Sequence, residues 1–227
     1  MFQFPQIIYG LTHRKLAQDQ DLIKQVQALL DGGLKLIQYR EKNLPDQEFE
    51  KEARRIQQII SHHSGQFIIN DRVTMAIKIG ADGIHIGQSD YYRFGETPAR
   101  ALDNIRWAYQ KKWHQDLIIG LSVSSYAEAH IAQASGADYI GVGAIYATPS
   151  KPDATVVSPQ DLKKIITEIK IPKVAIGGIN VQNYKLILKM GFESISMLRG
   201  LLDPKNTGSG SYDTVKDNVE RFIYENR

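Results

Sequence analysis

GADYIGVG, residues 136–143, is the stretch that decides the fold, because GADGIHIG at residues 80–87 repeats its pattern. Weaker copies begin at Gly33 and Gly191. In each copy a helical pattern ends in glycine, which most readily adopts the left-handed conformation just past a helix, and a short apolar strand follows. The copies stand about 50 residues apart, which accommodates two strand–helix units per interval. This spacing predicts eight units, the number in a (β/α)8 TIM barrel of the α/β class.

The remaining elements fit this architecture. Apolar segments predict strands at residues 7–11, 34–40, 67–70, 84–87, 117–123, 139–145, 173–177 and 194–197. Helical periodicity predicts helices at residues 21–31, 45–63, 73–79, 99–105, 126–134, 159–169, 181–190 and 212–224. Strands that alternate with helices favour a parallel sheet. Since no shift in composition marks a second domain, we predict that residues 1–227 form a single TIM-barrel domain.

One irregular segment interrupts the alternation, at residues 91–116. Its second half, residues 106–115, is basic and aromatic and contains both tryptophans. One interpretation is a lid or a surface for a partner. The other interpretation, which we favour, is a barrel helix that ends in an exposed loop.

Composition limits the classes of function. No apolar run approaches the ~20 residues that cross a membrane, and the N-terminus lacks the pattern of a signal peptide. The absence of cysteine excludes disulfides and thiolate chemistry. We therefore expect a cytoplasmic protein that does not contact membranes. A formal net charge of +3 is too small to indicate nucleic-acid binding, but it suits anionic substrates.

The active site of a TIM barrel lies at the carboxyl ends of its strands. Polar, charged or glycine residues follow the second to eighth predicted strands at this rim: Gln38, Arg40 and Lys42; Asn70, Asp71 and Arg72; Gln88 and Asp90; Ser122 and Ser124; Thr148, Ser150 and Lys151; Gly177, Gly178 and Asn180; Arg199 and Gly200. Unrelated surface loops would not be expected to place so many polar and charged residues at the same rim. The rim is therefore the candidate site.

Cations at this rim point to an anionic ligand. Arg40, Lys42 and Lys151 are able to hold a multiply charged anion such as pyrophosphate. Thr148 and Ser150 add hydroxyl groups in the loop TPSKP, which two prolines stiffen. For this loop alone, a solvated surface loop is an equally good interpretation.

Two further features complete the site. Asp71 and Asp90 have no histidine or cysteine beside them, and oxygen ligands of this kind suit Mg²⁺ between carboxylates and substrate phosphates. Each aspartate is alternatively a helix cap or a turn residue. Gly178 and Gly200 follow the seventh and eighth strands, the usual place for a phosphate held by backbone N–H groups.

Motifs along the chain resemble those of the thiamine phosphate synthase (thiamine-phosphate pyrophosphorylase) family. They are Gln38-x-Arg40-x-Lys42, Asn70-Asp71-Arg72, His85-x-Gly87-Gln88-x-Asp90, Gly143-x-x-Tyr146-x-Thr148-Pro-Ser-Lys151 and Ala175-x-Gly177-Gly178-Ile179. They cover nearly the whole chain, in order. The resemblance implies that hydroxymethylpyrimidine diphosphate is joined to thiazole phosphate with Mg²⁺ as cofactor. It also implies a dissociative substitution, in which pyrophosphate leaves first and the thiazole nitrogen then captures the pyrimidine-methyl cation.

The resemblance also implies roles for the site residues. Those expected to contact pyrophosphate are Arg40, Asn70, Ser150 and Lys151, and the metal ligands are Asp71 and Asp90. Gln38 and Ser122 line the pyrimidine site, and Thr148, Gly178 and Gly200 lie near the thiazole phosphate. The expected catalytic residues are Arg40, Lys151 and Ser122, with Lys42 and Arg199 as further substrate-binding residues. The expected partners are the phosphorylated substrates, and a homo-oligomer is left open.

Two alternatives remain open, a relative of the thiazole tautomerases and a non-catalytic barrel that binds phosphates of the thiamine pathway. Ser124 stands where the family usually has the histidine that is linked to catalysis in the tautomerases, which disfavours the first alternative. Retention of both Asp71 and Asp90 disfavours the second. Two further differences from the family are a longer segment at residues 91–116, which we interpret as an insertion, and Arg199 in place of a small residue.

Overall fold

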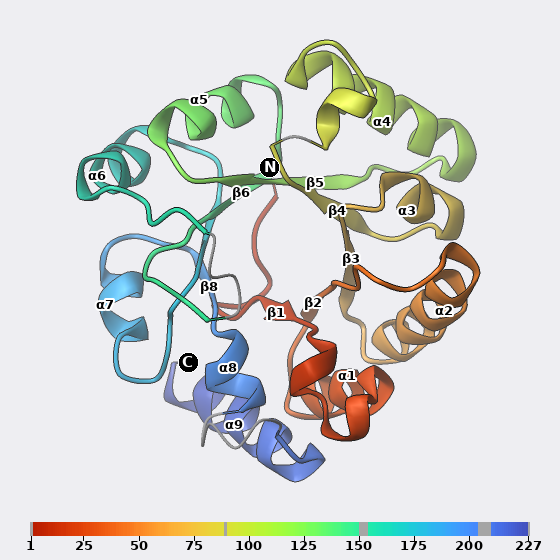
Figure 1. Cartoon of the computed structure of the whole chain (residues 1–227), viewed down its shortest axis with the longest axis vertical. Coiled ribbons are helices and arrows are strands. Elements are labelled where there is room, and N and C mark those ends of the chain that lie inside the picture. Colours follow the sequence, from red (N-terminus) through yellow and green to blue (C-terminus); the bar gives the residue numbers. More distant parts are fainter. Residues whose placement is uncertain (1, 89, 150–153, 204–209, 227) are drawn as a thin grey trace.

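Parallel strands form one curved sheet in the described part of the chain. The computed structural model describes residues 2–88, 90–149, 154–203 and 210–226. Eight strands follow one another in the order β1 (Gly10–Leu11), β2 (Leu36–Tyr39), β3 (Gln66–Asn70), β4 (Gly83–Ile86), β5 (Ile118–Val123), β6 (Tyr139–Val142), β7 (Lys173–Ile176) and β8 (Ser194–Ser196). Every neighbouring pair is parallel, and the strands form the ring in Figure 1.

The ring closes between β8 and the residues just before β1. Ile8 and Ile195 form a parallel bridge. Tyr9 N donates to Ile195 O at 2.9 Å, and Ile195 N donates to Ile7 O at 2.8 Å. The predicted first strand at residues 7–11 is thus divided, because its first half pairs with β8 and its second half with β2. The predicted (β/α)8 TIM barrel is confirmed.

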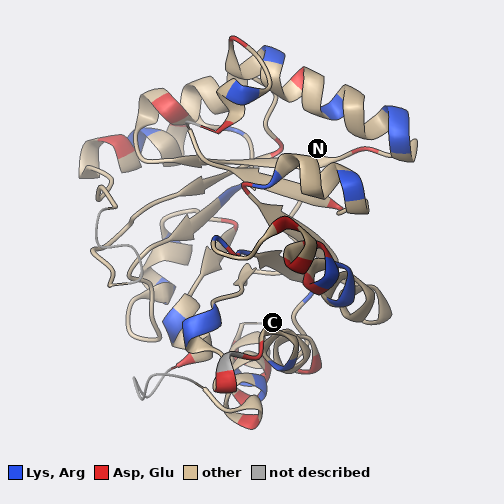
Figure 2. Cartoon of the chain, turned by 45° about the vertical axis from the view of Figure 1, so that its right-hand side comes forward, with Lys and Arg blue, Asp and Glu red and all other residues tan. Residues whose placement is uncertain are grey.

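Helices surround the strands on the outside (Figure 1). They are α1 (Leu22–Asp31), α2 (Asp46–His62), α3 (Val73–Ile79), α4 (Pro98–Trp113), α5 (Tyr126–Ala134), α6 (Pro159–Glu168), α7 (Tyr184–Lys189), α8 (Leu198–Leu202) and α9 (Tyr212–Glu225), with short 3-10 helices η1 (Arg14–Leu16), η2 (Gln18–Gln20) and η3 (Tyr91–Arg93). Acidic and basic residues are interspersed along these helices (Figure 2). Within the described residues, every helix is too short or too polar to span a bilayer.

The core has two parts, one on each side of the strands. The larger part fills the space between the strands and the outer helices. The smaller part lies inside the barrel and includes Tyr9, Tyr139 and Val174, with Phe2 and Phe4 packed against it. The N-terminal segment crosses the barrel in the view of Figure 1, consistent with these ring contacts. The interior is therefore a packed core that an aromatic N-terminal segment supports.

Helix α4 continues through residues 106–113, so the prediction of a helix that ends at residue 105 is wrong. Arg106 Nη1 donates to Leu117 O at 2.7 Å, and Nη2 donates to Asp138 Oδ2 at 2.9 Å. Trp113 Nε1 donates to Ile77 O at 2.7 Å. Arg106 and Trp113 thus attach α4 to the barrel, whereas Trp107 is exposed, and the sequence did not reveal these partners. That the segment is an insertion relative to the family stays a prediction.

We expect Arg106→Ala to lower the free energy of unfolding by about 1–2 kcal/mol, because hydrogen bonds to a partly solvated guanidinium are lost. Urea unfolding followed by circular dichroism measures the change. The matched control is Arg100→Ala, an exposed arginine on the same helix, which should change stability by less than about 0.5 kcal/mol. Equal losses in both variants would contradict an anchoring role for Arg106.

Candidate active site

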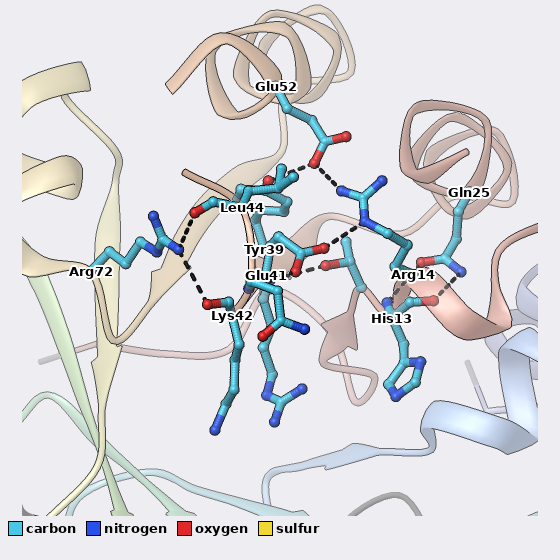
Figure 3. A network of polar contacts seen from close by, with 12 residues as sticks. His13, Arg14, Gln25, Tyr39, Glu41, Lys42, Leu44, Glu52 and Arg72 are labelled. Carbon is cyan, nitrogen blue, oxygen red and sulfur yellow. Dashed lines mark hydrogen bonds and ion pairs between the residues drawn. The ribbon is translucent and has the colours of Figure 1, made fainter. Parts of the chain in front are cut away.

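The loop after β2 carries two of the predicted cations, Arg40 and Lys42. Arg14, from η1, braces this loop from one side. Its Nε donates to Glu41 Oε2 at 2.6 Å, and its Nη2 donates to Glu52 Oε2 at 2.6 Å. Figure 3 shows the side chain of Lys42 pointing away from these pairs. Glu41 and Glu52 therefore bind Arg14, and the side chain of Lys42 points away from both ion pairs.

Arg72 braces the same loop from the other side (Figure 3). Its Nη2 donates to Leu44 O at 2.7 Å and to Lys42 O at 3.4 Å, and its Nη1 donates to Asp46 Oδ1 at 2.9 Å. Its guanidinium also stands over the Phe49 ring, 4.4 Å from the centroid. Arg72 follows a strand as predicted, but these contacts position the loop after β2.

Asp71 directly follows β3 in a left-handed conformation, with φ of 60°. Asp71 N donates to His85 O at 2.9 Å, which ties this turn to β4. Burial, followed by the nearby charge of Asp90, raises the pKa of Asp71 above its usual range, and Lys42 and Arg40 partly offset this. The structure thus brings together the two predicted metal ligands and two of the predicted cations. A left-handed non-glycine residue carries backbone strain of the kind that concentrates at functional sites.

Asp90 is the N-cap residue that precedes η3, in the connection that follows β4, and its side chain makes no capping hydrogen bond. A Cβ atom on Gly87 would lie 3.1 Å from Asp90 Oδ2, so this carboxylate lies close over the end of β4. Across the ranges that the structure describes, no group of three or more His, Cys, Asp or Glu side chains is arranged to hold an ion. A pair of carboxylates nevertheless fits Mg²⁺, which commonly takes one or two carboxylates and completes its shell with waters and substrate phosphates.

His13 lies at this rim and was missed, since no residue after the first strand was considered. Burial, and then the charges of Arg40 and Arg199, lower the pKa of His13. Its backbone N–H donates to Oε1 of the buried Gln25 at 3.0 Å. Its Nδ1 is buried and has no partner among the described residues. The imidazole therefore adds an uncharged group to a cationic neighbourhood. Inspecting the residues that follow the first predicted strand, as for the other strands, would have identified His13.

The two predicted pyrimidine-site residues face the barrel interior. Gln38, on β2, is buried and donates through Nε2 to the Tyr9 hydroxyl at 2.9 Å. Ser122, on β5, lies with its Oγ 2.9 Å from His85 Nε2. Gln88 Nε2 donates to Ser122 O at 2.6 Å, which ties the end of β4 to β5. Ser122 and Gln38 therefore belong to one polar interior.

Backbone hydrogen bonds hold the two ends of the loop after β6 together. Ala144 N donates to Thr155 O at 3.1 Å, and Val157 N donates to Ala144 O at 2.9 Å. Ile145 N donates to Ile176 O at 2.9 Å, so the loop also follows the end of β7. Thr148 is half-buried within it. The predicted residues Ser150 and Lys151 lie outside the described residues.

Gly178 has φ of 66°, and a Cβ atom there would lie 2.6 Å from Tyr146 Cβ. Glycine is required because a larger residue would push the loop after β6 away. Gly200 lies in α8, where a Cβ atom would lie 3.7 Å from Asn180 Cα. The two predicted phosphate-binding glycines thus stand at the ends of neighbouring strands.

The two rim residues that we predict to differ from the family pattern, Arg199 and Ser124, have partners of their own. Arg199 Nη1 pairs with Asp203 Oδ2 at 3.2 Å, and that carboxylate is only 1% exposed. Part of the Arg199 charge is therefore already compensated within the protein. Ser124 N and Oγ donate to Glu128 Oε2 at 2.6 and 3.0 Å, so Ser124 organises the start of α5.

A TIM barrel with cations and paired carboxylates at its carboxyl rim defines a class of phosphate-binding barrel proteins. The particular family follows from comparison, since the family model described as thiamine monophosphate synthase matches residues 8–201. The chain belongs to this family.

Individual relatives agree over nearly their full length. The thiamine-phosphate synthase of Clostridium acetobutylicum is 39% identical over 214 residues, which are 93% of this chain and 95% of the relative. That of Fusobacterium nucleatum is 36% identical and covers 92% of this chain and 96% of the relative. A solved thiamine phosphate pyrophosphorylase from Pyrococcus furiosus is similar with a TM-score of 0.75 at 32% identity, covering 96% of this chain and 95% of that one.

Proposed function

We propose that this protein is a transferase that catalyses the thiamine-phosphate synthase reaction. The bond between the pyrimidine methylene carbon and the diphosphate oxygen breaks, and pyrophosphate leaves with the bonding electrons. The thiazole nitrogen supplies the electron pair of the new C–N bond, giving thiamine phosphate. The observation that carries this proposal is the convergence of Asp71, Asp90, Arg40 and Lys42 at the rim of a barrel from this family.

The residues at the rim suit a leaving group whose negative charge grows as the bond breaks. Arg40 and Lys42 would bring positive charge to it, and Asn70, Ser150 and Lys151 would be further contacts of the leaving pyrophosphate. Such preorganised charge acts where the transition state needs it and requires little acid–base machinery. The absence of cysteine from the whole sequence fits this chemistry.

Asp71 and Asp90 would hold Mg²⁺. When bound, the ion neutralises phosphate charge and orients the diphosphate. The raised pKa of Asp71 fits such a site, because a cation offsets the cost of two neighbouring carboxylates. The raised pKa of Asp71 is thus consistent with a cation held between the carboxylates of Asp71 and Asp90.

The other site residues divide between the two organic substrates. Gln38 and Ser122 would orient the pyrimidine ring from opposite sides of the interior. The thiazole phosphate would be held by Thr148 and Arg199 and by backbone N–H groups at Gly178 and Gly200. His13 would border the phosphates without adding charge at neutral pH.

The comparisons favour neither a tautomerase nor a non-catalytic barrel. The relatives from Clostridium acetobutylicum and Fusobacterium nucleatum carry the synthase name and match this chain over more than nine-tenths of its length. Location in the cytoplasm and assembly into a homo-oligomer stay predictions from the sequence.

The deciding experiment measures thiamine phosphate and pyrophosphate after mixing the purified protein with both substrates and Mg²⁺. Formation of the two products in equal amounts, dependent on each substrate, is expected. Chelation of the metal should stop the reaction, and added Mg²⁺ should restore it. Binding of both substrates with no turnover would instead identify a phosphate-binding barrel.

A further inference from the structure

A chain of hydrogen bonds crosses the barrel interior from β2 to β5. It starts at Gln38, whose Nε2 donates to the Tyr9 hydroxyl at 2.9 Å. The hydroxyl oxygens of Tyr9 and Tyr139 lie 2.6 Å apart. The Tyr139 hydroxyl lies 3.1 Å from His85 Nδ1, and His85 Nε2 lies 2.9 Å from Ser122 Oγ. These five residues are named here the interior chain.

The barrel makes room for the interior chain. A Cβ atom on Gly120 would lie 2.1 Å from Tyr139 Cζ, and one on Gly141 would lie 2.8 Å from His85 Cε1. Phe4 packs on Tyr139 edge to face, with ring centroids 5.3 Å apart. Tyr139 is fully buried, and His85 is 8% exposed. Sterics therefore leave these two rings little freedom to turn.

The partners of the interior chain favour one direction for its protons. Tyr9, Tyr139 and His85 are all buried, and burial favours the uncharged form of each group, so at neutral pH both hydroxyls are protonated and the imidazole carries one N–H. The Gln38 amide nitrogen only donates, so the Tyr9 hydroxyl accepts from it and donates to Tyr139. Tyr139 then donates to His85 Nδ1. The single N–H of His85 is left on Nε2 and donates to Ser122 Oγ.

The opposite direction is disfavoured. If Ser122 donated to His85 Nε2, the single imidazole proton would lie on Nδ1 and would be donated to the Tyr139 hydroxyl. Tyr139 would then donate to Tyr9, which already accepts from Gln38. The Tyr9 hydrogen would then lack an acceptor at a site that is only 3% exposed. An unsatisfied buried donor costs far more than an exchanged hydrogen bond yields.

We propose that Tyr9, Tyr139 and His85 are positioning residues that keep the Ser122 hydroxyl oriented as a hydrogen-bond donor toward the substrate. Because its oxygen accepts from His85, the Ser122 hydrogen remains for an acceptor atom of the ligand. At the other end of the interior chain, the side-chain amide of Gln38 keeps its second N–H and its oxygen Oε1 for the ligand. The substrate's identity rests on the proposed function, but the direction of the interior chain does not.

Nitrogen-15 NMR of the ligand-free protein tests the direction of the interior chain. Among six histidines, the His85 signals are those that disappear in His85→Gln. The expected result at pH 7 is a single tautomer with the proton on Nε2 and an acceptor-type shift at Nδ1. In Tyr139→Phe, which removes the donor to Nδ1, a mixture of tautomers is expected. A His85 proton on Nδ1 in the unaltered protein overturns the proposal, whether or not the protein turns over.

Kinetics test the consequence for Ser122. Tyr139→Phe should lower kcat about tenfold, the effect of one misdirected hydrogen bond, with KM for thiazole phosphate unchanged. The matched control is Tyr109→Phe, which also removes a buried hydroxyl, one that donates to Ala81 O at 2.8 Å outside the barrel interior. This control should lose stability but keep both kcat and the His85 tautomer.

The two readouts separate the possible failures. Equal kcat in Tyr139→Phe and Tyr109→Phe, with the His85 tautomer unchanged, would overturn the positioning role. If the unaltered protein makes no thiamine phosphate, the proposed function fails, and the tautomer still decides the direction of the interior chain. If Tyr139→Phe does not fold, the wild-type tautomer decides alone.

Discussion

Replacing Asp71 by asparagine is expected to lower kcat by about 10²- to 10³-fold, because metal-assisted charge stabilisation is worth several kcal/mol and about 1.4 kcal/mol is tenfold in rate. Asparagine is a better choice than alanine, since Asp71 has φ of 60° and asparagine tolerates that conformation. Rising Mg²⁺ should restore part of the activity, because Asp90 remains. Initial rates over a series of Mg²⁺ concentrations measure both effects, and Asp90→Asn should behave alike.

The same substitution should stabilise the ligand-free protein at pH 7. The pKa of Asp71 is raised in the folded state, first by burial and then by Asp90. A raised carboxyl pKa means that the folded state binds the proton more tightly, so stability falls as pH rises through the folded-state pKa. Asp71→Asn removes this loss. Its urea midpoint should therefore exceed that of the unaltered protein at pH 7, and the difference should shrink toward acid pH.

Asp82→Asn is the control, because Asp82 lies before β4, at the other end of that strand from Asp90. Its Oδ2 accepts from Phe67 N at 2.7 Å. The Mg²⁺ dependence of Asp82→Asn should match that of the unaltered protein. If Asp71→Asn lowers the urea midpoint and Mg²⁺ restores none of its activity, Asp71 has a structural role and the metal site is wrong.

Lys151→Ala is expected to lower kcat by about 10²- to 10³-fold, with a smaller change in KM for the pyrimidine diphosphate. The loop carrying residue 151 is held at its base by the hydrogen bonds between Ala144 and Thr155 and between Val157 and Ala144. An ammonium on such a loop would meet the leaving pyrophosphate as its charge grows. An interaction that strengthens toward the transition state acts mainly on turnover.

Lys151→Arg should recover only part of this loss, because a planar guanidinium does not replace a compact charge between two prolines. The control is Lys163→Ala, an exposed lysine on α6 beyond the same loop, which should leave kcat unchanged. Rates at saturating Mg²⁺ and both substrates measure the series. A near-normal kcat in Lys151→Ala would remove the loop from the mechanism.

Local pattern was enough to predict the fold, and it predicts which charged residues form the candidate site. The repeated glycine followed by an apolar strand reflects the local geometry of a helix end, which depends on neighbouring residues alone. Asp71 and Asp90 could be placed together because parallel strands put their carboxyl ends at one edge. The end of α4 was misjudged, because residues 106–113 are basic and aromatic and their partners, such as Leu117 O and Asp138, are set by the closed barrel.

The order of strands and helices and the residues expected at the rim follow from the amino-acid sequence, because both depend on periodicity and on position along each strand. Three contacts became apparent in the folded barrel alone: Arg72 positions a loop, Arg199 pairs with Asp203, and Tyr139 joins the interior chain. In a strand buried on both faces, an apolar run does not reveal which side chains point inward. Their partners come from strands far apart in the chain, and barrel closure alone brings these together.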